Sequence, residues 1–247
     1  MIIPFISHAE EITLGQLQGE WLNKKYIETL QLTKSPIKAV DGIYYTSFTI
    51  FKENNSYRWG QNYNFHEGII FNIIELLPTF EPHNYQIVYE PIYEREPVDR
   101  ETYCDTLYIS GDKPFNEMEW IFTQIHGIPK GEKLRIPFVR VEPNIDEYVN
   151  RIVLAGTYTD KQGRTFVFSK SEEAQWPDKS FRYKVGLDYI FESCDFFWAY
   201  NDNDKYFPYA FSWQDDKLYI YNTYPHKEVP ELKFERDDKP LYILTPQ

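Results

Sequence analysis

Cysteine, long apolar runs and clusters of basic residues are all scarce in this sequence. Only two cysteines, Cys104 and Cys194, occur among 247 residues. Two cysteines in a chain of this length exclude a disulfide-rich scaffold, and the sequence leaves open whether they pair. No segment approaches the ~20 apolar residues of a membrane-spanning helix, and the apolar N-terminal run is too short for a signal-peptide core. We therefore expect a cytoplasmic protein.

Positive charge is also limited, with 26 Lys and Arg against 38 Asp and Glu and a formal net charge of −12. Proteins that bind nucleic acid or anionic membranes concentrate Lys and Arg against phosphates, so neither partner is expected here. The sequence has no zinc-ligand spacing, no phosphate-binding glycine loop and no Gly-x-Ser-x-Gly element. We expect no metal and no cofactor, and the oligomeric state stays open.

Aromatic residues, in contrast, are abundant: 21 Tyr, 18 Phe and 6 Trp make up 18% of the chain. Tyr and Phe suit the half-buried surface of a β-strand. Aromatic rings with polar tips also suit the wall of a ligand cavity. The composition therefore indicates a β protein with a large core.

The residue pattern predicts one short helix followed by many strands. Asn23 can cap a helix over residues 24–32, in which Tyr26, Ile27 and Leu30 share a face. From Ile43 onward, apolar residues alternate and turns recur about every ten residues, which is typical of an antiparallel meander. We predict an all-β fold with a single antiparallel up-and-down barrel that spans residues 1–247. The short helix would lie between the first two strands.

Several details of this pattern carry their own expectations. Residues 151–159 and 117–126 are predicted as strands from their β-branched and aromatic content. The proline-rich stretch after Asn222 is predicted as a surface tail. Phe207 and Tyr209 alternate with Pro208 and Ala210, and the sequence leaves open which of these two faces points inward.

The tripeptide Gly19-Glu20-Trp21 at the start of the meander resembles the first strand of the calycins, the lipocalins and fatty-acid-binding proteins. The resemblance implies that Trp21 closes one end of the barrel and that Gly19 lets the backbone pack closely. It also implies that the short helix covers the mouth of a cavity that holds a small hydrophobic or amphipathic molecule.

Five residues are candidates for contact with such a ligand: Tyr26, Arg58, Trp59, His66 and Tyr183. A buried Arg58 would match the two oxygens of a carboxylate, and His66 would supply a hydrogen bond or act as a base. The alternatives are that Arg58 is exposed to solvent and that His66 has a structural role. Tyr183 lies on the apolar face of a strand over residues 180–191, and Asp195 remains ambiguous. No catalytic residue is assigned.

Three functions remain open. The leading hypothesis is binding of a small hydrophobic or amphipathic molecule inside the barrel. The second is an acid–base enzyme, such as a lyase or isomerase, that uses His66, Glu67 or tyrosines in the same cavity. The third is a barrel filled by its own side chains that serves as a structural or interaction domain.

Overall fold

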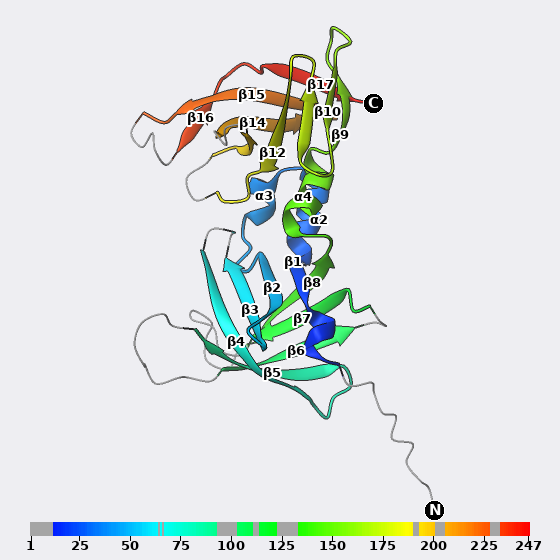
Figure 1. Cartoon of the computed structure of the whole chain (residues 1–247), viewed down its shortest axis with the longest axis vertical. Helices are drawn as coiled ribbons and strands as arrows, with labels where there is room; N and C mark the ends of the chain where they lie inside the picture. Colours follow the sequence, from blue (N-terminus) through cyan, green and yellow to red (C-terminus); the bar gives the residue numbers. More distant parts are fainter. Residues whose placement is uncertain are drawn as a thin grey trace, which may run out of the picture. The chain divides into compact units, whose positions relative to one another are not determined.

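The computed structural model describes residues 12–63, 65, 67–92, 103–110, 114–122, 133–189, 193–200, 206–227 and 233–247. The chain divides into two compact units, and neither is a continuous stretch of sequence. The first unit contains residues 1–24, 47–61 and 68–141, and the second contains residues 25–46, 62–67 and 142–247. Each unit contains a closed antiparallel barrel (Figure 1). The prediction of a mostly-β barrel fold is confirmed, and the prediction of a single barrel is wrong.

Eight strands in sequence order close the first barrel. Their bounds are β1 Gly19–Asn23, β2 Ser47–Glu53, β3 Ser56–Tyr63, β4 Glu67–Pro78, β5 Asn84–Pro91, β6 Tyr103–Ser110, β7 Glu117–Phe122 and β8 Leu134–Val141. β1 pairs with β2 on one side and with β8 on the other, so that Glu20 lies opposite both Thr49 and Val141. This double pairing of the first strand makes the sheet a closed ring.

The Gly-x-Trp segment forms a packed cluster at the start of β1. Trp21 is fully buried, and its indole Nε1 donates to the Leu17 carbonyl of α1 (Leu14–Leu17) at 3.1 Å. The Arg140 guanidinium lies 5.8 Å from the centre of the Trp21 ring and donates to the carbonyls of Gln16 and Gln18. Gly19 has a φ of +136°, and a Cβ there would lie 2.9 Å from Arg140 Nε. Glycine is therefore required both by its backbone angle and by the approach of Arg140.

The second barrel also follows sequence order, with one strand added beside it. Its strands are β9 Gly156–Thr159, β10 Thr165–Phe168, β11 Glu173–Trp176, β12 Lys179–Val185, β13 Asp195–Tyr200, β14 Tyr206–Gln214, β15 Lys217–Pro225, β16 Phe234–Arg236 and β17 Tyr242–Pro246. Pairing of β14 with β15, and of β17 with both β15 and β9, closes an eight-stranded ring, while β16 pairs only with β15.

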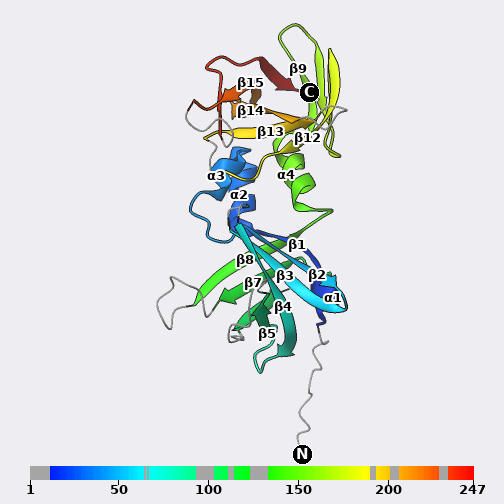
Figure 2. The ribbon, with the colours of Figure 1, turned by 60° about the vertical axis from the view of Figure 1, so that its left-hand side comes forward.

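Three helices belong to the second unit, where they lie beside β12 and β13 (Figure 2). They are α2 Lys24–Thr33, α3 Pro36–Val40 and α4 Ile145–Val153, of which α2 has its first residue in the first unit. Tyr26, Ile27 and Leu30 are buried, so the predicted helix and its apolar face are present. The prediction that this helix covers the mouth of the barrel that begins at Gly19 is wrong, because residues 25–46 pack in the second unit.

Two further predictions for the second unit are wrong. The first three residues of the predicted strand over residues 151–159 are the end of α4. The Asn144 side chain caps the start of this helix and accepts from Glu147 N at 2.8 Å. The β-branched residues there pack on one helical face, which overrides their preference for strands. The predicted proline-rich tail contains β17, whose Thr245 lies opposite Thr159 of β9. Proline cannot donate a hydrogen bond to a neighbouring strand, so prolines are expected outside the paired part of a sheet. β17 accommodates Pro246 because it is the last residue of the strand.

We expect Gly19→Ala to destabilise the first barrel. The backbone angle alone costs a non-glycine residue ~1–3 kcal/mol, and displacement of the Arg140 guanidinium adds to that cost. Gly60→Ala on β3 is the matched control, since a Cβ there would meet only Phe51 at 3.9 Å. Urea unfolding of both variants measures the difference, and an equal change in the free energy of unfolding would contradict the role of Gly19.

A candidate binding site in the first barrel

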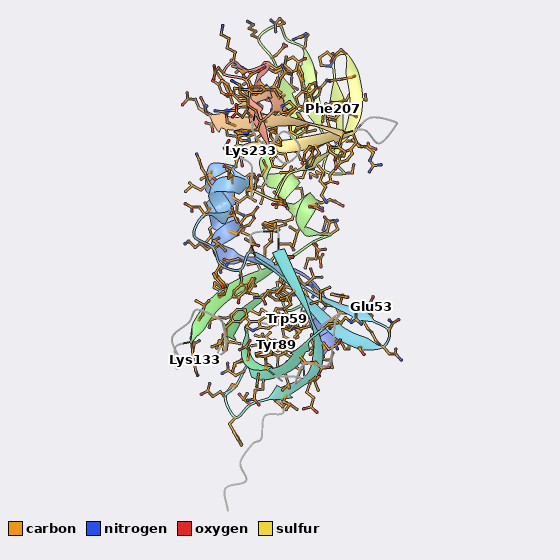
Figure 3. All side chains as sticks on the ribbon, turned by 90° about the vertical axis from the view of Figure 1, so that its left-hand side faces the viewer. Glu53, Trp59, Tyr89, Lys133, Phe207 and Lys233 are labelled. Carbon is orange, nitrogen blue, oxygen red and sulfur yellow. The ribbon has the colours of Figure 1, made fainter. Side chains whose placement is uncertain are left out.

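Aromatic rings from strands that are not neighbours meet across the first barrel. The Trp59 ring of β3 lies 4.5 Å from Trp120 of β7 and 5.2 Å from Tyr89 of β5, measured between ring centres. Phe48 of β2 likewise lies 5.0 Å from Trp120. Trp59 and Tyr89 lie inside the ring of strands in Figure 3, whereas Glu53 lies at its outer edge. The inner face of the barrel is therefore an apolar environment built largely from rings.

Two N–H groups on the inner face of β3 have no hydrogen-bond partner among the described residues. They are the indole Nε1 of Trp59 and the amide Nε2 of Gln61, and both side chains are buried, with 1% and 4% exposure. Residues two apart on a strand point to the same face, so both groups lie on the inside. A buried donor without an acceptor costs about 1–3 kcal/mol. An acceptor supplied by a bound molecule would remove that cost.

A buried carboxyl group lies in the same interior. Asp105 of β6 is 2% exposed and accepts hydrogen bonds from Tyr89 Oη at 2.6 Å and from Trp120 Nε1 at 3.1 Å. Tyr89 and Trp120 are two of the residues whose rings contact Trp59, together with Phe71. The interior thus combines an apolar wall, the Asp105 carboxyl group with its two donors, and the N–H groups of Trp59 and Gln61, which have no acceptor among the described residues.

Strand alternation carries a signal for these residues, although none of them except Trp59 is among the five predicted ligand contacts. Gln61 stands two positions after Trp59, so alternation places it on the same face. Asp105 precedes Leu107 and Ile109 on the apolar face of a predicted strand, where a charged residue is unusual. Only the closed barrel brings Gln61 and Asp105 around one interior.

Arg58 and Trp59 lie on opposite faces of β3. The Arg58 guanidinium forms an ion pair with Glu53 of the neighbouring strand β2, and the Arg58 side chain is 27% exposed. Trp59 points inward. Adjacent residues of a strand alternate in direction, so the structure does not bring these two candidates into one site. His66 and the side chain of Glu67 lie outside the described residues.

Tyr26 and Tyr183 belong to the second unit. The Tyr183 hydroxyl lies within hydrogen-bond distance of two acceptors, to which it can donate its one proton: Asn150 Oδ1 of α4 at 2.7 Å and the Ser169 carbonyl at 2.9 Å. Burial raises the Tyr183 pKa. The Tyr26 hydroxyl is buried and has no hydrogen-bond partner in the described part of the chain. Burial, with the nearby Asp195 carboxylate, raises the Tyr26 pKa. Tyr183 therefore connects β12 to α4. It belongs to the second unit and Trp59 to the first, so these two predicted ligand contacts are in different units.

Asp195, which the sequence left ambiguous, connects α3 to β13 in the second unit. Its carboxyl group accepts from Ser35 Oγ at 2.5 Å and from Ile37 N at 2.9 Å, near the start of α3. Burial raises the Asp195 pKa, although these hydrogen bonds oppose the shift. Tyr189 Oη donates to Asp195 at 3.4 Å, and burial raises the Tyr189 pKa as well.

Metal-binding clusters and membrane-spanning helices are absent from the part of the chain that the structure describes. No group of three His, Cys, Asp or Glu side chains in that part could hold a metal ion. None of its helices has the length and apolar character needed to cross a membrane. Cys104 and Cys194 are not joined by a disulfide.

We expect Asp195→Asn to change the pH dependence of stability. Folding raises the Asp195 pKa, so the folded chain holds this proton more tightly than the unfolded chain. The stabilising contribution is full below the unfolded-state pKa of about 4 and is lost as the pH rises through the folded-state pKa. The unfolding free energy of Asp195→Asn, relative to the parent, should therefore rise from pH 4 to pH 8. Asp238→Asn, at an exposed position of the same unit, should show no such trend.

A parallel pH dependence of Asp195→Asn and the parent protein would contradict the raised pKa. Loss of the Ser35 hydrogen bond shifts the whole curve of the variant by a constant amount. The slope with pH, and not that constant offset, therefore reports the titration of the carboxyl group.

Comparison with known proteins gives no relative from which a role could be transferred. No family model, no curated protein and no solved structure matches this chain. The geometry of the two barrels is therefore the basis for any statement about function.

Proposed function

We propose that the first barrel is a calycin-like binding module that takes a small hydrophobic or amphipathic molecule carrying a hydrogen-bond acceptor. One observation carries the proposal: Trp59 Nε1 and Gln61 Nε2 are buried on the inner face of β3, and no described residue supplies them with an acceptor. The meander of eight strands that begins at Gly19 and Trp21 agrees with the calycin arrangement.

The physical argument rests on the cost of the two unsatisfied donors. If Trp59 and Gln61 only filled the barrel, the protein would be more stable without their two unpaired donors. A methylene or sulfur in place of the Gln61 amide would remove the desolvation penalty. Residues that lower stability in this way are typical of binding sites. The surrounding rings of Trp59, Tyr89 and Trp120 would contact the apolar part of the molecule.

An acid–base enzyme in the same interior is the second candidate. The observation that favours it is the 2.6 Å hydrogen bond between Tyr89 Oη and Asp105 Oδ2. Two titratable groups at this distance can exchange a proton with a bound molecule. A molecule recovered chemically unchanged from the protein supports binding alone. Conversion by the parent protein that is abolished in Tyr89→Phe would support the enzyme.

We expect Gln61→Met to raise stability and to weaken binding. Methionine keeps the length of the side chain and removes the unpaired N–H, so the unliganded protein should gain about 1–3 kcal/mol of unfolding free energy. Native mass spectrometry of protein purified without delipidation should show a bound molecule in the parent and much less in the variant. Trp59→Phe removes the second donor and should reduce the bound fraction similarly.

Gln86→Met on β5 is the matched control, because Gln86 is exposed on the outside of the same barrel. It should change neither the stability nor the bound fraction. A parent protein without any bound molecule, together with a stabilised Gln61→Met, would favour the barrel filled by its own side chains. Equal occupancy in the parent and in Gln61→Met would rule out Gln61 as a ligand contact.

A further inference from the structure

The second barrel differs in character between its two ends. Near α4, Tyr183 of β12 donates to Asn150, and Trp213 of β14 donates to the Val153 carbonyl at 2.9 Å. Lys179 and Tyr209 precede these residues by four positions on the same strands, which is about 13 Å along each strand. The helices therefore occupy one end, and Lys179 and Tyr209 stand toward the other.

Lys179 lies among aromatic rings at that second end. Its ammonium Nζ donates to Tyr209 Oη at 2.8 Å. The same Nζ is 4.6 Å from the ring centre of Trp176, 5.1 Å from that of Tyr209 and 5.6 Å from that of Phe181. We call these four residues the Lys179 cluster. Lys179 lies directly opposite Trp176 in the β11–β12 hairpin, so both side chains are on the inner face.

Trp176 brings a buried donor to the same end of the barrel. It is 3% exposed, and its indole Nε1 has no hydrogen-bond partner within the part of the chain that the structure describes. Its ring contacts Tyr209 of β14 and Tyr242 of β17, strands that do not neighbour β11, so the ring lies inside the barrel. A buried indole N–H without an acceptor is costly, as it is for Trp59 in the first barrel.

The ammonium group of Lys179 forms no ion pair with a described carboxylate, so it can bind an incoming anion. Among the described carboxylates, none is within ion-pair distance of Lys179, although the neighbouring Asp178 acts electrostatically on Tyr242. Arg164, at 5.9 Å from the Tyr242 ring, is paired with Asp160. Since Tyr209 Oη accepts from Lys179, its own proton can be donated to a ligand. Lys179 and Tyr209 therefore supply two adjacent donor groups.

Solvent reaches the apolar surface at this end. Phe207 of β14 is 41% exposed (labelled in Figure 3) and its ring lies 5.9 Å from Tyr209. Phe181 and Tyr242 are partly exposed, whereas Phe197 deeper in the barrel is buried. A ligand could thus place an apolar body on these rings and a polar group against the donors.

We propose that the Lys179 cluster is a second binding site, for an amphipathic carboxylate. The carboxylate would accept from Lys179 and Tyr209 in a partly desolvated place, where such hydrogen bonds are strong. The alkyl or aryl part would contact Phe181 and Tyr242. This site lies in the second unit and does not depend on the proposal for the first barrel.

The test is calorimetric titration with octanoate and with 1-octanol, which share a chain and differ in charge. The parent protein should bind octanoate at least about tenfold more tightly than octanol. Lys179→Met keeps the side-chain stem on the rings and should lower octanoate affinity about 10- to 100-fold while leaving octanol unchanged. Lys179→Arg should restore most of the preference, which shows that the charge and not the fold is responsible.

Two further variants locate the bound octanoate on the protein. Lys161→Met, at an exposed position of the β9–β10 turn, should bind octanoate like the parent. In ¹⁵N-labelled protein, octanoate should shift the indole N–H resonance that is missing in Trp176→Phe. Failure of the parent to bind octanoate, or equal binding in Lys179→Met, would mean that Lys179 only covers the rings and would overturn the proposal. Loss of octanoate binding in Gln61→Met alone would assign it to the first barrel and would overturn it as well.

Discussion

Pairing between strands from opposite ends of each sheet is the constraint on which the rest of this structure depends. The first barrel has an enclosed interior only when β1 pairs with β8, and the second only when β17 pairs with β9. Closure removes the sheet edges and surrounds the inner faces, so aromatic residues on separate strands meet across them. In the first barrel this brings Trp59 to Trp120, and in the second it brings Trp176 to Tyr209. Without closure these rings would line an open sheet.

The polar exceptions inside these aromatic interiors point to function. Several buried polar groups have evident structural partners, as Tyr183 has in Asn150 and Asp105 has in Tyr89. Trp59, Gln61 and Trp176 instead carry buried N–H groups without acceptors. An uncompensated donor lowers stability, and such costs are usually retained where a bound molecule offsets them. The two proposed sites follow from the same physical argument applied to two separate interiors.

The second unit shows how polar contacts fix helices against a barrel. Asn150 connects α4 to Tyr183 and to the Ser169 carbonyl, while Asp195 accepts from Ser35 and Ile37 at the start of α3. These hydrogen bonds define where each helix lies, because apolar contacts alone would permit several orientations. The helices occupy one end of the barrel, which leaves the Lys179 end as the one where rings are exposed.

The sequence by itself determined the β-rich meander and the helix over residues 24–32 with its apolar face. Each of these follows from local alternation or helical periodicity, which a single segment carries. Only the tertiary structure decided that the strands form two barrels, that residues 25–46 pack with the second, and that Gln61 joins Tyr89 and Asp105. The pairing of distant strands and the packing surface of a helix depend on residues far apart in the sequence. Alternation along one strand is the same in either barrel, so it cannot predict them.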